Sequence, residues 1–370
     1  MNEPAHTTAM AIGDTPMELA WATVMAESIA GLAWSADGAT LYAGSADGQL
    51  VGLQGDGDWR FRCQAHDEGI TRVCAQPGST TLATAGEDGR VKLWQGDTGD
   101  ALATPVADRQ WIEHLAWSPD GTLLAAAAGP RLHVTDHDGA SHTWEGHPGN
   151  IGAIRWAPSG KRLASGANKG VHLWNVGSWE PVKVMDFPGA SVALAWSADG
   201  KALSTGTQDG FLYVRLHGPG TTPRLLTMSG YPGKVSALAW QPHPRPGQLL
   251  VASCGGSDVV LWRLDPRDSK REASPLRHHD HTVTALAWCG DGRFLGSGDR
   301  NGRLCLWTPR GALLHDLALG SEITLLSWHP RNNHLAVGSV DGTLRLFHLS
   351  DNAGSRGTDV GRDSSRHPSP

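Results

Sequence analysis

A histidine-rich segment is the part of the chain whose residue types best suit metal chemistry. His278, His279, Asp280 and His281 are consecutive in the sequence. Imidazole and carboxylate groups together bind transition metals such as zinc. Directly adjacent residues seldom point at one ion, so we predict that the protein has no resident metal and no other cofactor. His278 and His281 remain only as candidate ligands.

Common catalytic motifs are missing from the sequence. It contains no G-x-S-x-G, no G-x-x-x-x-G-K-[ST] and no H-E-x-x-H, the patterns that place a serine nucleophile, a phosphate loop or a catalytic zinc. Three basic residues, Arg72, His114 and Arg155, are scattered through segments that are otherwise apolar and small. We therefore predict that the protein is not an enzyme, with a hydrolase or isomerase as the remaining catalytic alternative.

Composition and charge argue against several other classes of protein. Lys and Arg total 31 against 37 Asp and Glu, a net charge of −6, whereas proteins that grip nucleic-acid phosphates usually carry a basic stripe. The five Cys form no C-x-x-C pair, which favours a reduced, cytoplasmic compartment. No apolar run approaches the ~18 residues of a membrane helix, and the N-terminus lacks a signal-like order of basic and apolar residues. We expect a soluble cytoplasmic protein without nucleic-acid or membrane partners.

The elements that must position these residues come from an internal repeat. Eight similar apolar segments recur, and all but one end in Trp. Their landmark residues are Trp34, Ala75, Trp117, Trp156, Trp196, Trp240, Trp288 and Trp328. The landmarks lie roughly 40 residues apart, the spacing of four-stranded propeller blades. Helical repeats of this length would show apolar residues at i, i+3 and i+4, and these segments do not.

Each repeat continues with two further short strands joined by tight turns, and a polar fourth strand closes it. Asp-Gly pairs occupy many of these turns, for example at 37–38, 88–89, 209–210 and 341–342. Asp-Gly between apolar runs is a strong hairpin signal because both central residues need positive φ. The third strand often ends in Trp, as at Trp94, Trp174, Trp262 and Trp307. The pattern predicts an all-β propeller of eight blades with four antiparallel strands each, with seven blades as the alternative.

The first strand of each repeat has a distinctive pattern. Its apolar residues occupy positions 1, 4 and 6, which breaks strict alternation and predicts a β-bulge near the strand start. Position 5 is small in all repeats but one, as expected where strands crowd near the propeller axis. Arg155 is the exception, and we expect its side chain to reach the central channel or the rim.

The chain ends predict how the ring closes. The last repeat ends near Leu349 without a fourth strand, and Met17–Met25 offers a spare apolar strand before the first repeat. We predict that this strand pairs onto the last blade, which leaves no open sheet edge. Residues 17–350 then form one propeller domain. Residues 1–16 are expected to be flexible, and the Gly-, Ser- and Arg-rich residues 351–370 disordered.

These repeats resemble the WD40 family across nearly the whole chain. The family marks are a His before the first strand, the Asp-Gly turn, a Trp ending the third strand, and a hydrogen-bond network of Ser or Thr, His, Asp and Trp inside a blade. The resemblance maps that network onto His66, Thr84, Asp88 and Trp94, onto His279, Ser297, Asn301 and Trp307, and more loosely onto His147, Ser165, Asn168 and Trp174. Tyr231 stands where a His is expected, and Gly129-Pro130 replaces one Asp-Gly turn.

Two further segments, WIEHLAWSPDG and MSGYPGKV, look like a bacterial WD40 group often associated with CobW-type (G3E) GTPases and metal homeostasis. This narrower resemblance implies a class of partner rather than an activity. It supplies the alternative function, a zinc-linked accessory protein that assists such a GTPase.

One face of the predicted ring carries the candidate binding residues. The loops before each first strand and the turns between second and third strands should form this top face. The binding candidates there are Asp67, Glu68, Arg109, Trp111, Lys169, Tyr231, Lys234 and Arg300, with Asn150, His278, His281 and Glu322 nearby. Aromatic and Arg residues are enriched in interface hot spots, so Trp111 and Tyr231 are the main candidates. We predict a monomeric, non-catalytic scaffold that binds protein or peptide partners through this face.

Overall fold

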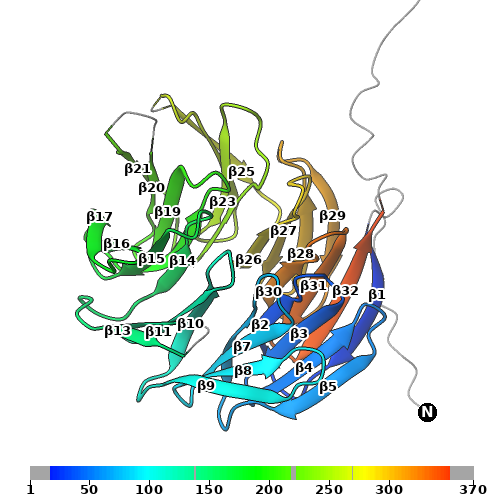
Figure 1. The fold of residues 1–370 in the computed structure, drawn as a ribbon. Coiled ribbons are helices and arrows are strands. Elements are labelled where there is room, and N and C mark those ends of the chain that lie inside the picture. Colours follow the sequence, from blue (N-terminus) through cyan, green and yellow to red (C-terminus); the bar gives the residue numbers. More distant parts are fainter. Residues whose placement is uncertain (1–16, 137–138, 218–221, 269, 351–370) are drawn as a thin grey trace, which may run out of the picture.

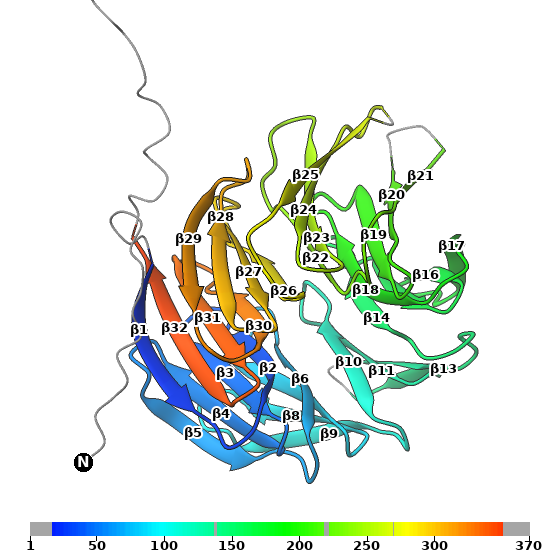
Figure 2. The same ribbon diagram turned by 180° about the vertical axis from the view of Figure 1, so that it is seen from behind.

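The computed structural model describes residues 17–136, 139–217, 222–268 and 270–350. Every regular element in these ranges is a β-strand, and the strands form eight four-stranded antiparallel sheets. The sheets are arranged around a central axis as the blades of a propeller (Figures 1 and 2). The prediction of eight blades rather than seven is confirmed. The expectations for residues 1–16 and 351–370 concern parts of the chain outside the described ranges.

Blades 1 to 4 follow one another along the chain. Blade 1 comprises β2 (Ile29–Trp34), β3 (Thr40–Ser45), β4 (Gln49–Gln54) and β5 (Trp59–Gln64). Blade 2 comprises β6 (Ile70–Ala75), β7 (Thr81–Gly86), β8 (Arg90–Gln95) and β9 (Ala101–Ala107). Blade 3 comprises β10 (Ile112–Trp117), β11 (Leu123–Ala128), β12 (Arg131–Asp136) and β13 (Ser141–Trp144). Blade 4 comprises β14 (Ala153–Trp156), β15 (Arg162–Ala167), β16 (Gly170–Asn175) and β17 (Pro181–Met185).

Blades 5 to 8 complete the ring. Blade 5 comprises β18 (Ser191–Trp196), β19 (Ala202–Thr207), β20 (Leu212–Leu216) and β21 (Arg224–Met228). Blade 6 comprises β22 (Ala237–Trp240), β23 (Leu249–Cys254), β24 (Val259–Leu264) and β25 (Arg271–Leu276). Blade 7 comprises β26 (Val283–Trp288), β27 (Leu295–Asp299), β28 (Arg303–Trp307) and β29 (Leu313–Ala318). Blade 8 comprises β30 (Ile323–Trp328), β31 (His334–Ser339), β32 (Thr343–Leu349) and β1 (Met17–Val24).

Blade 8 joins the two ends of the described chain. β1 pairs antiparallel with β32, with Met17 opposite Leu349 and Val24 opposite Thr343. The two strands lie side by side at the blue and red ends of the colour range (Figure 1). The innermost strands contact one another all the way around, and β30 meets β2. The predicted closure by the N-terminal strand is confirmed, and it leaves no gap in the ring at which blades could separate.

The core lies between neighbouring blades rather than inside single ones. Between blades 1 and 2, for example, Tyr42 and Leu50 pack with Ile70, Leu82 and Trp94. Apolar burial of this kind is the main stabilising contribution to a repeat array, because each sheet buries its faces only against its neighbours.

The innermost strands carry the predicted β-bulge. The pairing of first and second strands shifts register between motif positions 1 and 3 in six of the blades, for example between Ile70 and Arg72. The shift turns positions 3 and 5 toward the axis, because side chains alternate along a strand. Small residues at these positions therefore leave a channel, and larger ones fill it.

Trp residues connect consecutive blades by hydrogen bonds. In seven blades the indole N–H at the end of the innermost strand donates to the main-chain carbonyl of motif position 5 in the preceding blade. The bonds are 2.9–3.3 Å long and join Trp34 to Ser327, Trp117 to Cys74, Trp156 to Ala116, Trp196 to Arg155, Trp240 to Ala195, Trp288 to Ala239 and Trp328 to Ala287. Blade 2 has Ala75 at this position and lacks the bond. These repeated Trp residues thus stabilise the ring through directional hydrogen bonds as well as through apolar burial.

No helix within the described ranges is long and apolar enough to cross a membrane.

Candidate functional site

Blade 2 contains a chain of hydrogen bonds between buried polar groups. The Trp94 indole N–H donates to Thr84 Oγ1 at 2.8 Å, and Thr84 Oγ1 lies 2.7 Å from His66 Nε2. His66 Nδ1 lies 2.9 Å from Asp88 Oδ1. An indole can only donate and a carboxylate only accepts, so the order of donors runs from Trp94 through Thr84 and His66 to Asp88. Burial lowers the pKa of His66, which keeps the imidazole neutral and the network structural.

Blade 7 forms the same network with a different acidic partner. His279 Nε2 lies 2.7 Å from Ser297 Oγ, which accepts from the Trp307 indole at 2.8 Å. His279 Nδ1 pairs with Asp299 at 2.9 Å, so the assignment of Asn301 to this role is wrong. Asn301 lies in the turn, where its backbone N–H donates to the other oxygen of Asp299. The carboxylate at the end of β27 satisfies both the turn and the imidazole.

Blade 4 departs further from the expected network. His147 Nε2 lies 2.9 Å from Ser165 Oγ, and the Trp174 indole donates to the same oxygen at 2.8 Å. His147 Nδ1 is directed at the main-chain carbonyl of Pro130 in blade 3, 3.2 Å away, so the looser assignment of Asn168 is also wrong. Burial lowers the pKa of His147 to about 4.

Tyr231 replaces the histidine in blade 6. Its hydroxyl accepts from the Trp262 indole at 2.7 Å and lies 2.6 Å from Ser253 Oγ. The ring is half-buried, and burial raises the pKa of the phenol to about 12. Tyr231 therefore acts inside the blade, which corrects its place among the main binding candidates.

The remaining binding candidates stay at the surface. Each is exposed and lies in a loop before an innermost strand or in a turn between second and third strands: Asp67, Glu68, Arg109, Trp111, Lys169, Lys234 and Arg300. Asn150 and His281 are exposed as well, and Glu322 is half-buried beside Arg300, with 3.8 Å between their charged atoms. These residues come from many blades, and the structure gathers them on one face of the ring.

Trp111 differs from the Trp residues of the blades. Its side chain is 53% exposed, and among the described residues its indole N–H has no hydrogen-bond partner. An exposed indole with an unused donor is typical of a contact residue that acquires its partners on binding.

An anchor holds the loop of Trp111, and sequence analysis did not find it. Asp108 accepts a hydrogen bond from the Gln110 backbone N–H at 2.9 Å and from Arg131 Nε at 2.7 Å. Its second oxygen lies 3.0 Å from His133 Nε2. Although burial opposes it, these bonds hold the pKa of Asp108 well below its usual range. The loop that presents Trp111 is thus tied to β12 of the same blade.

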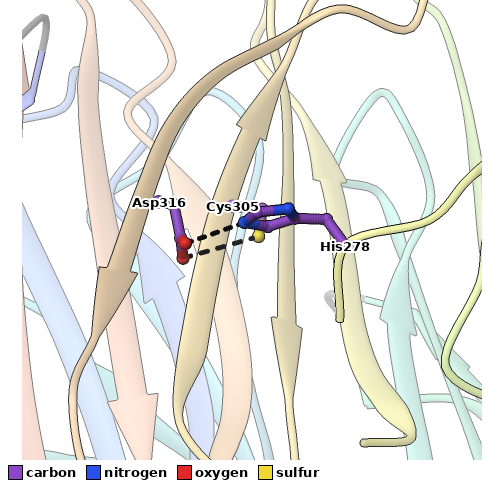
Figure 3. A group of neighbouring side chains, drawn as sticks. All are labelled: His278, Cys305 and Asp316. Atoms are coloured by element: carbon purple, nitrogen blue, oxygen red, sulfur yellow. Dashed lines mark hydrogen bonds and ion pairs between the residues drawn. The ribbon is translucent and has the colours of Figure 1, made fainter. Parts of the chain in front are cut away.

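One residue of the histidine-rich segment, His278, lies beside two residues that the sequence did not predict as its neighbours. Figure 3 shows His278 reaching from the loop before β26 toward Cys305 on β28 and Asp316 on β29. His278 Nε2 lies 2.7 Å from Asp316 Oδ2, and ligand atoms of all three residues lie within 4.8 Å of one another. His281 is not part of this group. Nothing in the spacing of the sequence places Cys305 and Asp316 beside His278.

The charges of this group are already balanced without a cation. Arg303 Nη1 donates to Asp316 Oδ2 at 3.1 Å and lies 3.2 Å from His278 Nε2. Burial raises the pKa of the Cys305 thiol, and a protonated thiol is a poor metal ligand. The guanidinium of Arg303 already pairs with the carboxylate that a metal would need as a ligand. The geometry therefore fits an ion-pair cluster better than a metal centre.

Two cavities open on the ring. A cavity of about 240 Å³ lies on the axis and is lined by the innermost strands, with Arg72, His114 and Arg155 as its charged or titratable residues. Arg155 thus reaches the channel, one of the two places expected for it. A larger cavity of about 540 Å³ lies among turns between first and second strands, on the face opposite Trp111; His243, Asp291, His329 and Arg331 are among its lining residues.

A family model matches several of the repeats. The model described as WD domain, G-beta repeat matches residues 24–51, 58–95, 140–175, 270–308 and 315–348. Three of these matches contain the histidines His66, His147 and His279 and the Trp residues that share their networks. Tyr231 and the first three strands of blade 6 lie outside the matched ranges, whereas β25 falls within 270–308.

Several curated proteins are similar to the chain over most of its length. The human serine-threonine kinase receptor-associated protein is 24% identical over 307 residues, covering 80% of this chain and 83% of its own. The fission-yeast target of rapamycin complex subunit wat1 is 25% identical and covers 74% and 76%. Human striatin-4 is 26% identical and covers 78% of this chain but 43% of its own. These relatives are eukaryotic, and their names carry no link to CobW-type GTPases.

Among solved structures, the computationally designed Ika8 protein has a similar fold. Its TM-score is 0.74 at 24% identity, with 88% of this chain and 98% of that chain covered. At this level of identity the likeness supports the architecture alone.

Proposed function

Because the chain belongs to the WD40 repeat family, we propose that it is a non-catalytic adaptor that binds protein or peptide partners through the top face of its ring. The names of two relatives describe a receptor-associated protein and a subunit of a complex. A family likeness does not by itself identify a function. The proposal therefore depends on what this chain presents at its surface.

The observation that carries the proposal is Trp111 on its anchored loop. The exposed indole supplies a large apolar surface and an unused donor. The bonds of Asp108 to Gln110 and Arg131 fix the loop before a partner arrives. Binding by a pre-organised group costs little conformational entropy, so more of the contact energy appears as affinity.

Charged side chains of both signs lie on the loop of Trp111 and on the neighbouring blade. Arg109 adjoins Trp111, and Asp67, Glu68 and Arg90 lie on the neighbouring blade, where Arg90 and Asp67 approach to 3.9 Å. An apolar anchor within a mixed polar rim is the usual anatomy of a protein interface. A partner that inserts an apolar side chain beside Trp111 and carries charges of both signs fits this surface.

The test is quantitative affinity purification of the tagged protein from its native host, followed by mass spectrometry. The Trp111→Ala variant should lose its specific partner by roughly tenfold or more, as expected for a hot-spot residue. Trp59→Ala is the matched control, because Trp59 is 42% exposed but lies on outer strand β5. Equal recovery of partners by Trp111→Ala and wild type would contradict the proposal.

The proposal also covers the location of the protein, its oligomeric state and the ligands that it does not need. We propose that it acts in the cytoplasm as a monomer, without a cofactor and without nucleic-acid or membrane partners. A zinc-linked accessory role would require bound metal, and the balanced ion pairs around His278 do not favour it. Metal analysis of the purified protein separates the two functions, because the adaptor role predicts no stoichiometric zinc.

A further inference from the structure

Three basic side chains interrupt a cavity lining that otherwise consists of small, hydroxyl and aliphatic residues. Arg72 of β6 and His114 of β10 occupy motif position 3, and Arg155 of β14 occupies position 5. Blades 5 to 7 have alanine at position 3, namely Ala193, Ala237 and Ala285, and blade 8 has Leu325. The cavity of about 240 Å³ lies between these two sides. The basic residues thus form one arc, contributed by blades 2 to 4, that faces open space.

Neither guanidinium has an acidic partner. Arg72 Nη1 donates to its neighbouring carbonyl of Thr71 at 2.6 Å, and Arg155 Nη1 donates to the carbonyl of Ile154 at 2.8 Å. Within the described residues no carboxylate lies within 4.0 Å of either group, although the charge of Glu113 acts on Arg72 from farther away. A guanidinium carries five N–H donors, so most of the donors of both residues remain unused.

The two guanidinium groups share one channel. Arg72 and Arg155 are both solvent-exposed, and the solvent that reaches them is that of the channel between the innermost strands. Burial lowers the pKa of Arg155, and the charge of Arg72 lowers it further. Burial is also the main cause of the lowered pKa of Arg72. Two like charges in an enclosed site repel each other, and an anion between them would relieve that repulsion.

The neighbouring titratable groups add no compensating charge. Burial and the two guanidinium groups lower the pKa of His114 to about 3, so the imidazole is neutral near pH 7. Burial raises the pKa of Cys74 to about 11, and its thiol donates to the Leu115 carbonyl. The net charge that faces the cavity is therefore that of two guanidinium groups, because the imidazole is neutral and its N–H is bonded to the Ile151 backbone.

We propose that the axial cavity is a binding site for a phosphate dianion, either free phosphate or the terminal phosphate of a small phosphomonoester. Two negative charges match the two guanidinium groups, and planar guanidinium groups bind phosphate oxygens through paired hydrogen bonds. The cavity has the volume of about eight water molecules at about 30 Å³ each. That volume holds a phosphate group together with a small substituent.

The test is calorimetric titration of the full chain in a buffer free of phosphate and sulfate. Inorganic phosphate is titrated in one arm and glycerol 1-phosphate in the other. The wild-type protein should bind one anion per chain. Arg72→Met and Arg155→Met should each weaken binding roughly tenfold or more, and the double variant should not bind. Arg271→Met, on outer strand β25, is the charge-matched control and should bind as the wild type does.

The two arms distinguish the source of the phosphate. Binding of both ligands indicates a site for a phosphomonoester, whereas binding of inorganic phosphate alone indicates free phosphate. The proposal is overturned if the wild type binds neither ligand up to about 10 mM, or if the Arg variants bind as tightly as the wild type does.

Thermal unfolding provides a readout that does not depend on the titration. Without phosphate, Arg155→Met should melt at the same temperature as the wild type or higher, because the variant removes one of two repelling charges. Added phosphate should raise the melting temperature of the wild type but not of the double variant. If Arg155 instead held the Ile154 carbonyl for structural reasons, the variant would melt lower and phosphate would have no differential effect.

Discussion

The blade networks and the axial cavity use enclosed polar side chains in opposite ways. In blade 2 every donor from Trp94 to His66 meets an acceptor, and the chain ends on the carboxylate of Asp88. In the cavity Arg72 and Arg155 keep most of their donors unused. Satisfied buried groups rigidify a fold, while exposed donors without a protein partner can bind a ligand. The contrast separates the structural role of the histidines from the binding role that we propose for the arginines.

The Trp residues likewise divide into structural residues and a candidate contact residue. Trp156 is buried, and its indole donates across a blade junction to Ala116. Trp111 is 53% exposed and lies on a loop that other residues hold in place. One residue type thus serves the assembly of the ring at one position and, in our proposal, recognition at the other. The predictions below test this division, beginning with the largest expected effect.

Removing a blade-junction Trp should destabilise the ring strongly. Trp156→Ala deletes a buried indole and its bond to Ala116, and we expect a loss of about 3–5 kcal/mol in the free energy of unfolding. Trp111→Ala, as an exposed substitution, should change it by less than about 0.5 kcal/mol. Equilibrium denaturation in urea measures both variants. Similar losses for the two would contradict the division between structural and binding Trp residues.

Acid should destabilise the protein through its buried histidines. The pKa of His147 is about 4 in the fold against 6.5 for the free side chain, because burial disfavours the charged form. Below pH 6.5 the unfolded chain binds a proton that the folded chain does not. Stability therefore falls between pH 6.5 and 4, by about 3 kcal/mol for this residue.

Substitution of the histidine checks that assignment. His147→Gln should show a shallower loss of stability over the same pH interval than the wild type, whatever its stability at neutral pH. His281→Gln, at an exposed position of the top face, should retain the wild-type slope. An unchanged slope for His147→Gln would mean that other groups cause the acid sensitivity.

Weakening the anchor of the Trp111 loop should show whether partner binding depends on the position of the loop as well as on contact with Trp111 itself. Asp108→Asn removes the charge that pairs with Arg131 and His133 and should cost about 1–2 kcal/mol of stability. It should also weaken partner binding while leaving Trp111 itself intact. Affinity measured for Asp108→Asn and Trp111→Ala in parallel tests this, and normal binding by the Asp108 variant would show that the loop needs no anchor.

Removing a cavity arginine should have the smallest effect on stability. Arg155→Met should change the free energy of unfolding by less than about 0.5 kcal/mol in phosphate-free buffer. Removal of a structural polar group should have a larger effect, because it leaves the buried group to which it was hydrogen-bonded without a partner. A loss comparable to that of a blade-network variant such as His66→Ala would place Arg155 with the structural residues.

Periodicity made the architecture predictable from the sequence. The spacing of the Trp landmarks, the spare strand Met17–Met25 and the break in alternation near Ile70 each correspond to a feature of the structure. Such features repeat, so each copy supports the others. A single local signal, such as one Asp-Gly turn, does not have this support.

The incorrect predictions concern hydrogen-bond partners that depend on a single residue of one blade. Asn301 was assigned by analogy of place in the turn, but the carboxylate of Asp299, at the strand end, has the acceptor that His279 needs. His147 found its partner in the Pro130 carbonyl of another blade. Contacts between blades depend on how the ring closes, and a repeat pattern does not specify them. The anchor of Asp108 was missed for a different reason, because it joins residues 23 positions apart in the chain that no motif links.

The most direct test of the proposed binding face is photo-crosslinking from position 111. A photo-reactive amino acid replaces Trp111 in one protein and Trp59 in a second, and both are irradiated in cells of the native host. We predict that a protein partner crosslinks specifically to position 111 and that unlabelled wild-type protein competes for it. Crosslinking of the same proteins from both positions, or from position 59 alone, would contradict the assignment of the top face as the binding surface.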